Sequence, residues 1–492
     1  MTLIFNGQQF KYEIESVVKL FIPVVHFDFL YENTAENIEG DYCLCERKIS
    51  DNTAYLTAEC KLDGKTLHFE DTLKSDIENF DGECEISLCS MVFKALSQLT
   101  DKKVGWGTLT GVRPVKRVNN MLADGMNENE IKSELKRRFS VSEEKSEIAC
   151  LTAKTQQDIV RKIDDKAFAL YVSIPFCPSR CSYCSFVSQE VEKSLELIPK
   201  YVYNLSREIE KTGEIATSLG LKLQSVYFGG GTPTSLEAHY LKSLMDTIRN
   251  SFDMSDVLEY TVEAGRADTI TEDKLLTIKE MGADRVSINP QTLNNDVLKA
   301  IGRKHTVEDF FDKYNLARKI GFKTINTDLI AGLPTDTTES FKNTIDGIIS
   351  LSPENVTVHT LSVKRTSNIN VNGEYQVLKN PACEMVDYAT KTLLEKGYNP
   401  YYLYKQKNML DNLENIGWSI PDHESLYNVY IMEEIQTILA VGAGASTKLV
   451  DNKNSRLERI FNYKLPLEYI KNFDLMLKKK QDIERFYNFE KE

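Results

Sequence analysis

Three closely spaced cysteines are the residues of this chain best suited to chemistry. Cys177, Cys181 and Cys184 lie in the run Tyr171–Phe186 with the spacing C-x3-C-x2-C. Iron–sulfur clusters are held by cysteine thiolates, and a closed cluster usually takes four of them. Three thiolates leave one iron for a ligand that is not protein, and an open metal position is where a metal site does chemistry. The spacing therefore predicts an iron–sulfur cluster with an open site.

Two simpler interpretations of these cysteines are a disulfide with a spare thiol and one half of a zinc site. Residues 1–22 lack the basic start, long apolar run and small-residue cleavage site of a secretory signal, so we expect a cytoplasmic protein. A reducing compartment disfavours disulfides. A structural zinc site usually needs two cysteine pairs, and no second pair follows. The remaining cysteines are scattered and look unpaired: Cys43, Cys45, Cys60, Cys84, Cys89, Cys150 and Cys383.

Length and charge limit the classes of function. A chain of 492 residues is expected to form two or three domains, and 41% hydrophobic residues are enough for real cores. The net charge of −13 argues against a nucleic-acid binder, which usually carries a basic face. No apolar run reaches the length of about 18 residues that a membrane helix needs, so we expect no membrane insertion. The basic run Lys478–Lys480 is interpreted as a solvated helix face.

The elements that must position these cysteines begin near residue 167, where short β-rich runs alternate with amphipathic stretches. One such stretch carries Leu195, Ile198, Val202, Leu205 and Ile209 at helical spacing, with Pro199 near its start. The alternation predicts parallel βαβ units, in a partial barrel or an open doubly wound sheet. Ligands of both folds gather at the carboxyl ends of the strands. The expected strands are 167–176, 223–230, 259–265, 285–291, 324–332 and 355–362.

The regions on either side of these units lack the alternation of β-rich and amphipathic stretches. We expect an α+β N-terminal domain over 1–165, the parallel domain over 166–397 and a C-terminal region over 398–492. Asp63-Gly64 predicts a hairpin tip, and residues 88–160 predict helices. The glycine-dense loop 105–114 is interpreted as a buried turn. The alternative is a loop that lends Arg113, Lys116 or Arg117 to an anionic substrate.

Further motifs fall at the carboxyl ends of the expected strands. The glycines of the run 229–234 let a ligand approach the backbone and expose N–H groups. Gly442–Ser446 resembles part of a dinucleotide fingerprint, but no complete βαβ unit follows it, so we expect a close-packed turn. Polar residues end strands or follow them: Glu263, Gln291, Arg303 and Asp328, with His305 and His359 as possible acid–base groups. Glu263 can pair with Arg303 or bind a ligand.

Taken together, these motifs identify a family. Residues 167 to about 450 resemble the radical S-adenosylmethionine (SAM) enzymes of the oxygen-independent coproporphyrinogen III oxidase family, and the N-terminal region with Thr-Gly-Val-Arg-Pro resembles its extended clostridial and bacillar branch. The shared motifs, in chain order, are Tyr-x-x-Ile-Pro-Phe-Cys, Gly-Gly-Gly-Thr-Pro-Thr, a strand-end Glu, a strand-end Gln, Gly-Arg-x-His and Asp-Leu-Ile-x-Gly-Leu-Pro. The resemblance implies a partial (β/α)6 barrel with an N-terminal α+β domain and a C-terminal extension.

The resemblance also implies roles for these residues. Cys177, Cys181 and Cys184 would ligate a 4Fe–4S cluster, and Tyr171 and Arg180 would lie at the reacting centre. SAM would be bound by Tyr171, Gly230, Gly231, Thr232, Glu263, Gln291, Arg303 and Asp328. An electron donor such as flavodoxin or ferredoxin would reduce the cluster, and cleavage of SAM would give a radical that removes hydrogen from two propionate side chains. Loss of CO2 would then give protoporphyrinogen IX.

Two departures from the family pattern bear on the reaction. Phe186 stands where the well-characterised oxidases have a further cysteine, and Ser173 lies in the region where they carry a histidine before Pro-Phe. The phenylalanine is shared with members that bind or deliver heme, so a heme chaperone remains an alternative. A third alternative, a radical SAM enzyme acting on RNA, is disfavoured by the acidic charge. Basic residues expected to bind the propionates of a tetrapyrrole are Arg180, Lys364, Arg365 and Arg113.

Overall fold

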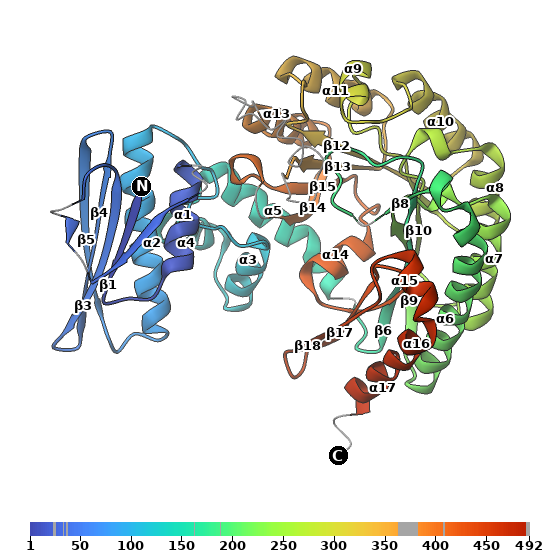
Figure 1. Ribbon diagram of the computed structural model, residues 1–492, viewed down its shortest axis with the longest axis horizontal. Helices are drawn as coiled ribbons and strands as arrows, with labels where there is room; N and C mark the ends of the chain where they lie inside the picture. Colours follow the sequence, from blue (N-terminus) through green and yellow to red (C-terminus); the bar gives the residue numbers. More distant parts are fainter. Residues whose placement is uncertain are drawn as a thin grey trace. The chain divides into compact units, whose positions relative to one another are not determined.

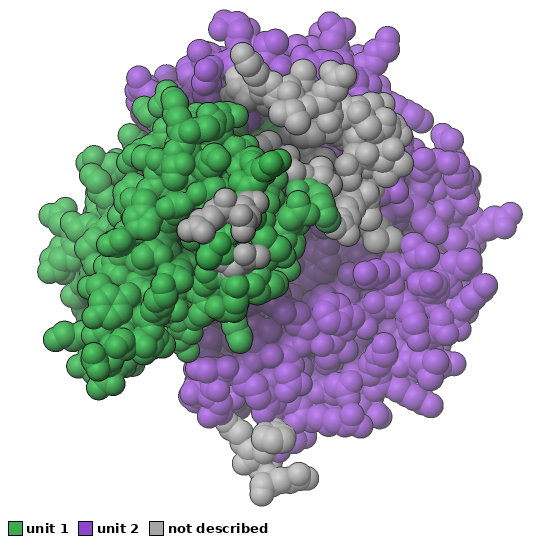
Figure 2. Space-filling view, turned by 60° about the vertical axis from the view of Figure 1, so that its left-hand side comes forward, with its two compact units in different colours: residues 1–153, 405–413 green, residues 154–404, 414–492 purple. Residues whose placement is uncertain are grey.

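The computed structural model describes the chain except for residues 23–25, 33, 36–37, 162, 187, 363–381, 407–408 and 489–492. The chain forms two compact units, which Figure 2 shows in different colours. Unit 1 comprises residues 1–153 and 405–413, and unit 2 comprises residues 154–404 and 414–492. The three-domain division expected from the sequence, with boundaries near residues 165 and 397, remains a prediction.

Unit 1 is a five-stranded sheet with helices packed on one face (Figure 1). The strand order is β2-β1-β3-β4-β5, with parallel pairing around β1 and antiparallel pairing from β3 to β5. Alternate residues of the strands face α1 and α2 and form the core. The elements are β1 Thr2–Asn6, α1 Lys11–Phe21, β2 Asp28–Tyr31, β3 Tyr42–Ser50, β4 Thr53–Leu62, β5 Lys65–Lys74, α2 Phe80–Thr100, α3 Pro114–Ala123, α4 Glu128–Phe139 and α5 Glu143–Val160, which continues into unit 2.

Two local expectations for unit 1 are confirmed. Asp63 and Gly64 form the tip of the β4–β5 hairpin, and both have positive φ, 48° and 78°, as a two-residue turn requires. The loop 105–114 contains a buried turn, in which the side chain of Trp106 is only 1% exposed. A Cβ atom at Gly107 would lie 1.9 Å from the carbonyl oxygen of Phe139, so the turn needs glycine there.

Unit 2 is built on one large sheet that contains the six parallel strands expected from the sequence. They occur as consecutive neighbours, β6-β9-β10-β11-β12-β13, with no reversal of strand order. A doubly wound sheet would reverse its order at a switch point, so the order favours the partial barrel. The strands are β6 Ala167–Ile174, β9 Lys222–Gly230, β10 Glu259–Glu263, β11 Arg285–Ser287, β12 Thr324–Ala331 and β13 Asn355–Thr360.

Helices between these strands form an outer layer along the sheet (Figure 1). Their apolar faces turn inward, as in α6, where Ile198, Val202, Leu205 and Ile209 are buried. The longer helices are α6 Ile198–Ser218, α7 Ala238–Ser251, α8 Glu272–Glu280, α10 Val307–Ile320, α11 Thr338–Ser350 and α13 Ala382–Glu395, and the short helix α9 covers Asn295–Ala300.

Elements after residue 398 extend the same sheet at both of its ends. Strands β14 and β15 join beside β13, and β16 lies parallel to β6 with β17 and β18 beyond it. The elements are β14 Asn399–Tyr404, β15 Asn415–Ser419, α14 Leu426–Glu433, β16 Thr437–Val441, β17 Ser446–Asp451, β18 Arg456–Phe461, α15 Pro466–Lys471, α16 Phe473–Lys479 and α17 Gln481–Asn488. No helix in the described part of the chain is long and apolar enough to cross a membrane.

Three local expectations for unit 2 are wrong. Strand β11 ends at Ser287; Pro290 has no N–H for a continuous ladder, and Gln291, with a φ of 72°, pairs with Leu329 of β12 only as an isolated bridge. Leu195 precedes α6 and is 60% exposed, so it is not part of the helix face. Lys480 is only 1% exposed, so the basic run Lys478–Lys480 is not wholly solvated.

Candidate functional site

The loop that carries the three cysteines is fixed by backbone hydrogen bonds to the glycine turn. Strand β6 ends at Ile174, before Pro175, and Cys177 lies in the short strand β7 Phe176–Cys177, paired with β8 Gln189–Glu190. The N–H of Gly231 donates to the carbonyl of Ile174 at 2.8 Å, and the N–H of Thr232 donates to the carbonyl of Phe176 at 2.8 Å. The two turns are therefore joined through their backbones.

Glycine is required where these two turns approach each other. A Cβ atom at Gly231 would lie 2.6 Å from the Phe176 carbonyl oxygen and 3.0 Å from the sulfur of Cys177. Gly230 has a φ of 108°, which other residues rarely adopt, and its Cβ atom would lie 3.0 Å from the Ser173 hydroxyl. The glycine run thus brings bare backbone against the first cysteine.

The three thiols lie in a partly buried, polar environment. Cys181 is buried, whereas Cys177 and Cys184 are half-buried. Cys177 is 3.5 Å from the Thr232 hydroxyl, and the guanidinium of buried Arg266 is 3.8 Å from the sulfur of Cys181. Burial raises the pKa of the Cys177 and Cys184 thiols, so a metal must displace their protons when it binds.

A carboxylate and a stack of tyrosines lie at the ends of the first parallel strands. Glu263 accepts a hydrogen bond from the Tyr227 hydroxyl at 2.7 Å, and it is not paired with Arg303. The ring of Tyr227 stacks on Tyr427 of α14 at 4.3 Å, and Tyr427 stacks on Tyr171 of β6 at 5.8 Å. Tyr171 therefore has a fixed ring plane, held by residues from β9 and α14.

Asp328 forms a second polar centre on β12. Its carboxylate accepts hydrogen bonds from Asn289 Nδ2 at 2.7 Å and Asn326 Nδ2 at 2.8 Å, and it lies 3.9 Å from Nε2 of His359. Burial alone would raise the pKa of Asp328, but His359 and the hydrogen-bond donors around it lower that pKa overall. Its negative charge in turn helps to raise the pKa of Glu263, although burial is the larger cause.

Arg303 contacts the cysteine loop, whereas Gln291 is hydrogen-bonded to the backbone of β12 at Asp328 and Ile330. Arg303 donates to the carbonyls of Gly265 and Asn289 at 3.2 and 3.3 Å, and to the Tyr183 hydroxyl at 3.0 Å. Its guanidinium thus joins Tyr183, a residue of the cysteine loop, to the backbone at Gly265 and Asn289. Among the described atoms, Gln291 Oε1 and Arg303 Nε have no hydrogen-bond partner although both are buried. Buried polar atoms in this state point to a missing ligand or water.

The remaining expected residues are less closely tied to this centre. Arg180 is an exposed residue of the cysteine loop. His305 is 4% exposed and lies 3.9 Å from Asp268, behind the loop rather than beside Glu263. Lys364 and Arg365 lie outside the described residues. Arg113 belongs to unit 1.

Several residues of the site were missed by sequence reasoning: Tyr183, Tyr227, Arg266, Asn289 and Tyr427. One of them had a usable signal. Tyr227 stands two residues before the motif residue Gly229 in β9, where strand alternation puts the two positions on the same face. Tyr427 had no such signal, because it comes from a helix far along the chain.

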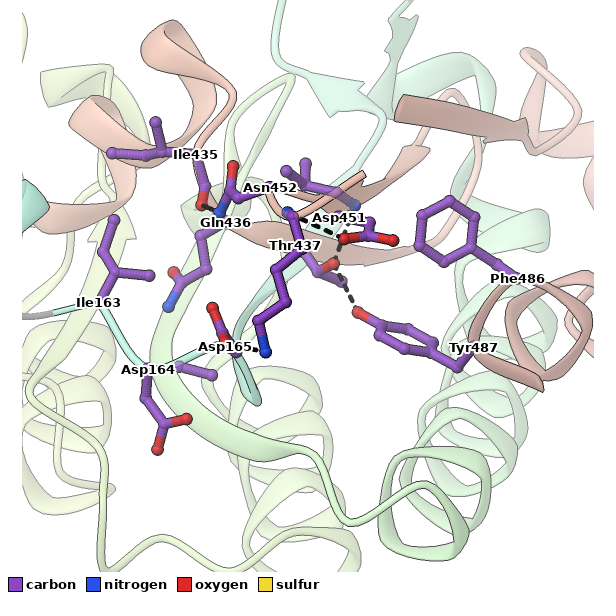
Figure 3. Close-up of a pocket in the computed structure, with 13 residues that line it drawn as sticks. Ile163, Asp164, Asp165, Ile435, Gln436, Thr437, Asp451, Asn452, Phe486 and Tyr487 are labelled. Carbon is purple, nitrogen blue, oxygen red and sulfur yellow. Dashed lines mark hydrogen bonds and ion pairs between the residues drawn. The ribbon is translucent and has the colours of Figure 1, made fainter. Parts of the chain in front are cut away.

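The cavity shown in Figure 3 lies at the other ends of the strands. It has a volume of about 130 Å³ and is lined by residues that precede or begin β6 and β16, among them Asp165 and Thr437. The Thr437 hydroxyl lies 2.6 Å from that of Tyr487. Since the cysteine loop follows the carboxyl end of β6, this cavity is not part of the site described above.

The carboxyl group of Glu263 predicts a pH-dependent stability. Burial raises its pKa to about 7, against about 4.3 in an unfolded chain. Between these values the folded state holds more protons than the unfolded state, so the free energy of unfolding falls as pH rises. Glu263→Gln has no carboxyl group to titrate at this position, so it removes this fall in the free energy of unfolding. Calorimetry of metal-free protein should show a thermal midpoint above that of the wild type at about pH 8, with a smaller excess at about pH 6.

Glu196→Gln, at an exposed position, is the control for this prediction and should leave the difference between the two pH values unchanged. An equal excess for Glu263→Gln at both pH values would show that Glu263 does not titrate in this range.

Residues 171–348 match the model of the radical SAM superfamily. The oxygen-independent coproporphyrinogen-III oxidase-like protein HemZ of Bacillus subtilis is 41% identical over 376 residues, which cover 75% of each chain. The heme chaperone HemW of Lactococcus lactis is 29% identical over 65% of this chain and 81% of its own.

Among solved structures, the coproporphyrinogen III oxidase HemN of Escherichia coli, a radical SAM enzyme, superposes with a TM-score of 0.51 at 23% identity. The superposition covers 66% of this chain and 73% of that one, and it supports the fold. The 41% identity with HemZ extends over three quarters of both chains, and it shows the family. The chain therefore belongs to the radical SAM superfamily, in the family of oxygen-independent coproporphyrinogen III oxidase-like proteins.

Proposed function

We propose that this protein catalyses the oxygen-independent oxidation of coproporphyrinogen III to protoporphyrinogen IX, with a 4Fe–4S cluster and SAM as cofactors. The observation that carries the proposal is the joining of the cysteine loop to the glycine turn, in a sheet that carries two half-buried carboxylates on β10 and β12. Removal of hydrogen from an unactivated carbon needs a cofactor, while the protein supplies binding and orientation.

The donor set at the loop fits the cluster. Cys177, Cys181 and Cys184 offer three thiolates, and Arg266 places a positive charge near one of them. In the described part of the chain, no three His, Cys, Asp or Glu side chains are already arranged around a metal position. The thiols would therefore converge when iron binds, and loss of their protons would accompany binding.

The residues around the loop fit a polar, amino-acid-like ligand. The bare backbone of Gly230 and Gly231 and the hydroxyl of Thr232 would receive its amino-acid end, and Glu263 and Asp328 would accept hydrogen bonds from it. The unpartnered Oε1 of Gln291 is a further acceptor. Arg303 would act chiefly through Tyr183, which it holds in place. When bound, the cluster and SAM supply one-electron chemistry that removes hydrogen from carbon.

The chain's own residues orient the substrate and keep water away. Tyr171 has a ring whose plane is fixed by the stack with Tyr427 and Tyr227, and this rigid aromatic group would help to bound the reacting centre. Arg180 in the exposed part of the loop would bind a propionate. The proposal includes a cytoplasmic location and a reducing partner of the flavodoxin or ferredoxin type.

A heme chaperone is the second candidate. Phe186, which is 68% exposed beside the third cysteine, stands where the oxidases have a further cysteine, and one relative is a heme chaperone. An exposed aromatic ring at the cluster loop suits contact with a porphyrin face or a partner protein.

One experiment separates the two candidates. Reduced, reconstituted protein is incubated without oxygen with coproporphyrinogen III and SAM, and vinyl products and 5′-deoxyadenosine are followed together. The oxidase predicts both products in a fixed ratio. Tight heme binding with no vinyl product would favour the chaperone and reject the oxidase.

Replacing any one cysteine of the loop should remove the cluster. Cys177→Ala, Cys181→Ala and Cys184→Ala each leave too few thiolates for an open cubane, so anaerobically reconstituted protein should lose its iron and its SAM cleavage. Iron and sulfide analysis measures this. Cys383→Ala, at an exposed cysteine, is the matched control and should keep full iron content. A full complement of iron in the Cys177 variant would refute the ligand assignment.

Neutralising the two carboxylates should weaken SAM binding without loss of iron. Glu263→Gln and Asp328→Asn each remove a charge-assisted hydrogen bond worth about 1.5–3 kcal/mol, so the Kd of SAM should rise about tenfold or more. Calorimetric titration of cluster-loaded protein measures it, and Asp312→Asn on the exposed side of α10 is the control. Unchanged affinity in both variants would leave these carboxylates with a structural role only.

A further inference from the structure

A turn from the C-terminal part of the chain is hydrogen-bonded to the strand that leads into the cysteine loop. Ser173, near the end of β6, donates its hydroxyl to the carbonyl of Ala443 at 2.7 Å. Gly442 has a φ of 95°, and a Cβ atom there would lie 2.5 Å from the carbonyl oxygen of Ser173. The turn 442–446, which the sequence marked as a glycine motif, therefore lies directly against β6.

Tyr201 of α6 joins the turn, the strand and the loop. Its hydroxyl donates to the Ser173 carbonyl at 2.8 Å and accepts from the N–H of Ala443 at 2.9 Å. Its ring packs edge-on against Phe176, the residue before Cys177, at 5.2 Å. The fully buried side chain of Tyr201 thus contacts the backbone of β6, the backbone of the turn 442–446, and Phe176, the residue before the first cysteine.

A buried ion pair holds the other side of the turn. Glu208 of α6 accepts hydrogen bonds from the N–H of Gly442 at 2.8 Å and from the Tyr469 hydroxyl at 2.7 Å. Asn462 donates to the same carboxylate at 2.7 Å. Lys480 lies 2.8 Å from it and also donates to the Ala440 carbonyl at 2.6 Å. The side chains of Glu208 and Lys480 are 0% and 1% exposed.

A charge pair so deeply buried is a poor device for stability alone. Removing two charges from water is costly, and apolar side chains of the same volume often stabilise a fold equally well. What such a pair supplies is a definite geometry, since each of its hydrogen bonds fixes an atom of the turn. The last residues of the described chain are thereby tied to the backbone beside the cysteine loop.

We propose that Tyr201 and the Glu208–Lys480 pair are positioning residues for the cluster, which fix the Cys177 end of the loop through the turn 442–446. The inference rests on the proposed function insofar as the loop holds a cluster. It adds that the C-terminal segment is part of the cluster's support. Sub-ångström displacement of a ligand loop is enough to weaken a metal site, because its geometry depends on the shell behind it.

Two isosteric variants separate positioning from simple stability. Tyr201→Phe removes the hydroxyl that binds Ser173 and Ala443, and Tyr469→Phe removes a hydroxyl of the same network that binds only Glu208. Both rings are buried and remain in place. Iron loss from anaerobically loaded protein to a ferrous chelator is measured for each, together with the thermal midpoint and the electron paramagnetic resonance spectrum of the reduced cluster.

The proposal expects iron loss about tenfold faster for Tyr201→Phe, with a changed spectrum, and within about twofold of wild type for Tyr469→Phe. Equal rates of iron loss in the two variants, or rates that follow only the thermal midpoints, would overturn it. These measurements need no tetrapyrrole, so they stand even if the oxidase reaction fails. A wild-type protein that takes up no iron would reject the cofactor assignment and this inference together.

The lysine run offers a second comparison on neighbouring residues. Lys480→Met leaves Glu208 charged and buried, whereas Lys478→Met and Lys479→Met change exposed residues. The double variant Glu208→Gln with Lys480→Met removes both charges and guards against simple failure to fold. The proposal expects faster iron loss in the double variant at a matched thermal midpoint. Lys478→Met and Lys479→Met should lose iron at the wild-type rate. Unchanged iron retention in the folded double variant would show that the pair does not position the loop.

Discussion

The structure of the site depends on two backbone hydrogen bonds, from Gly231 to Ile174 and from Thr232 to Phe176. They require that no side chain stands between the glycine turn and the cysteine loop, because a Cβ atom at Gly231 would collide with the Phe176 carbonyl. The glycine run is therefore needed for contact within the protein as well as for approach of a ligand. Each of the two turns follows a parallel strand, β9 and β6, and these strands are neighbours in the sheet.

Two partly buried carboxylates lie in the same sheet, Glu263 on β10 and Asp328 on β12. Glu263 is held by a single neutral donor, Tyr227, and its pKa rises, whereas Asp328 is surrounded by amide donors and a histidine, and its pKa falls. Two carboxylates of one sheet thus differ in proton affinity because their hydrogen-bond partners differ. Such a pair can accept hydrogen bonds from one polar ligand without the full cost of two buried charges.

The parallel strands and the cysteine loop could be predicted from the sequence because their signals are local. The β-rich runs between helical patterns predict six strands, and the spacing of the cysteines predicts a metal-binding loop. Local patterns could not show that β11 ends at Ser287, with Gln291 paired to β12 only as an isolated bridge, or that Lys480 is buried while Lys478 and Lys479 are exposed. Lys480 is buried because it meets Glu208, which lies far away in the sequence, and no local pattern encodes that pairing.

The position of Tyr427 shows why the site cannot be assigned to the parallel strands alone. Glu259, at the start of β10, accepts hydrogen bonds from the Ser425 hydroxyl at 3.0 Å and the N–H of Leu426 at 2.7 Å, so it binds the first turn of α14. A carboxylate at a helix N-terminus is favoured by the unpaired N–H groups there. This contact orients α14 so that Tyr427 stacks on Tyr227, which in turn holds Glu263. The first residue of β10 thus positions its last, through a helix that comes more than a hundred residues later in the chain.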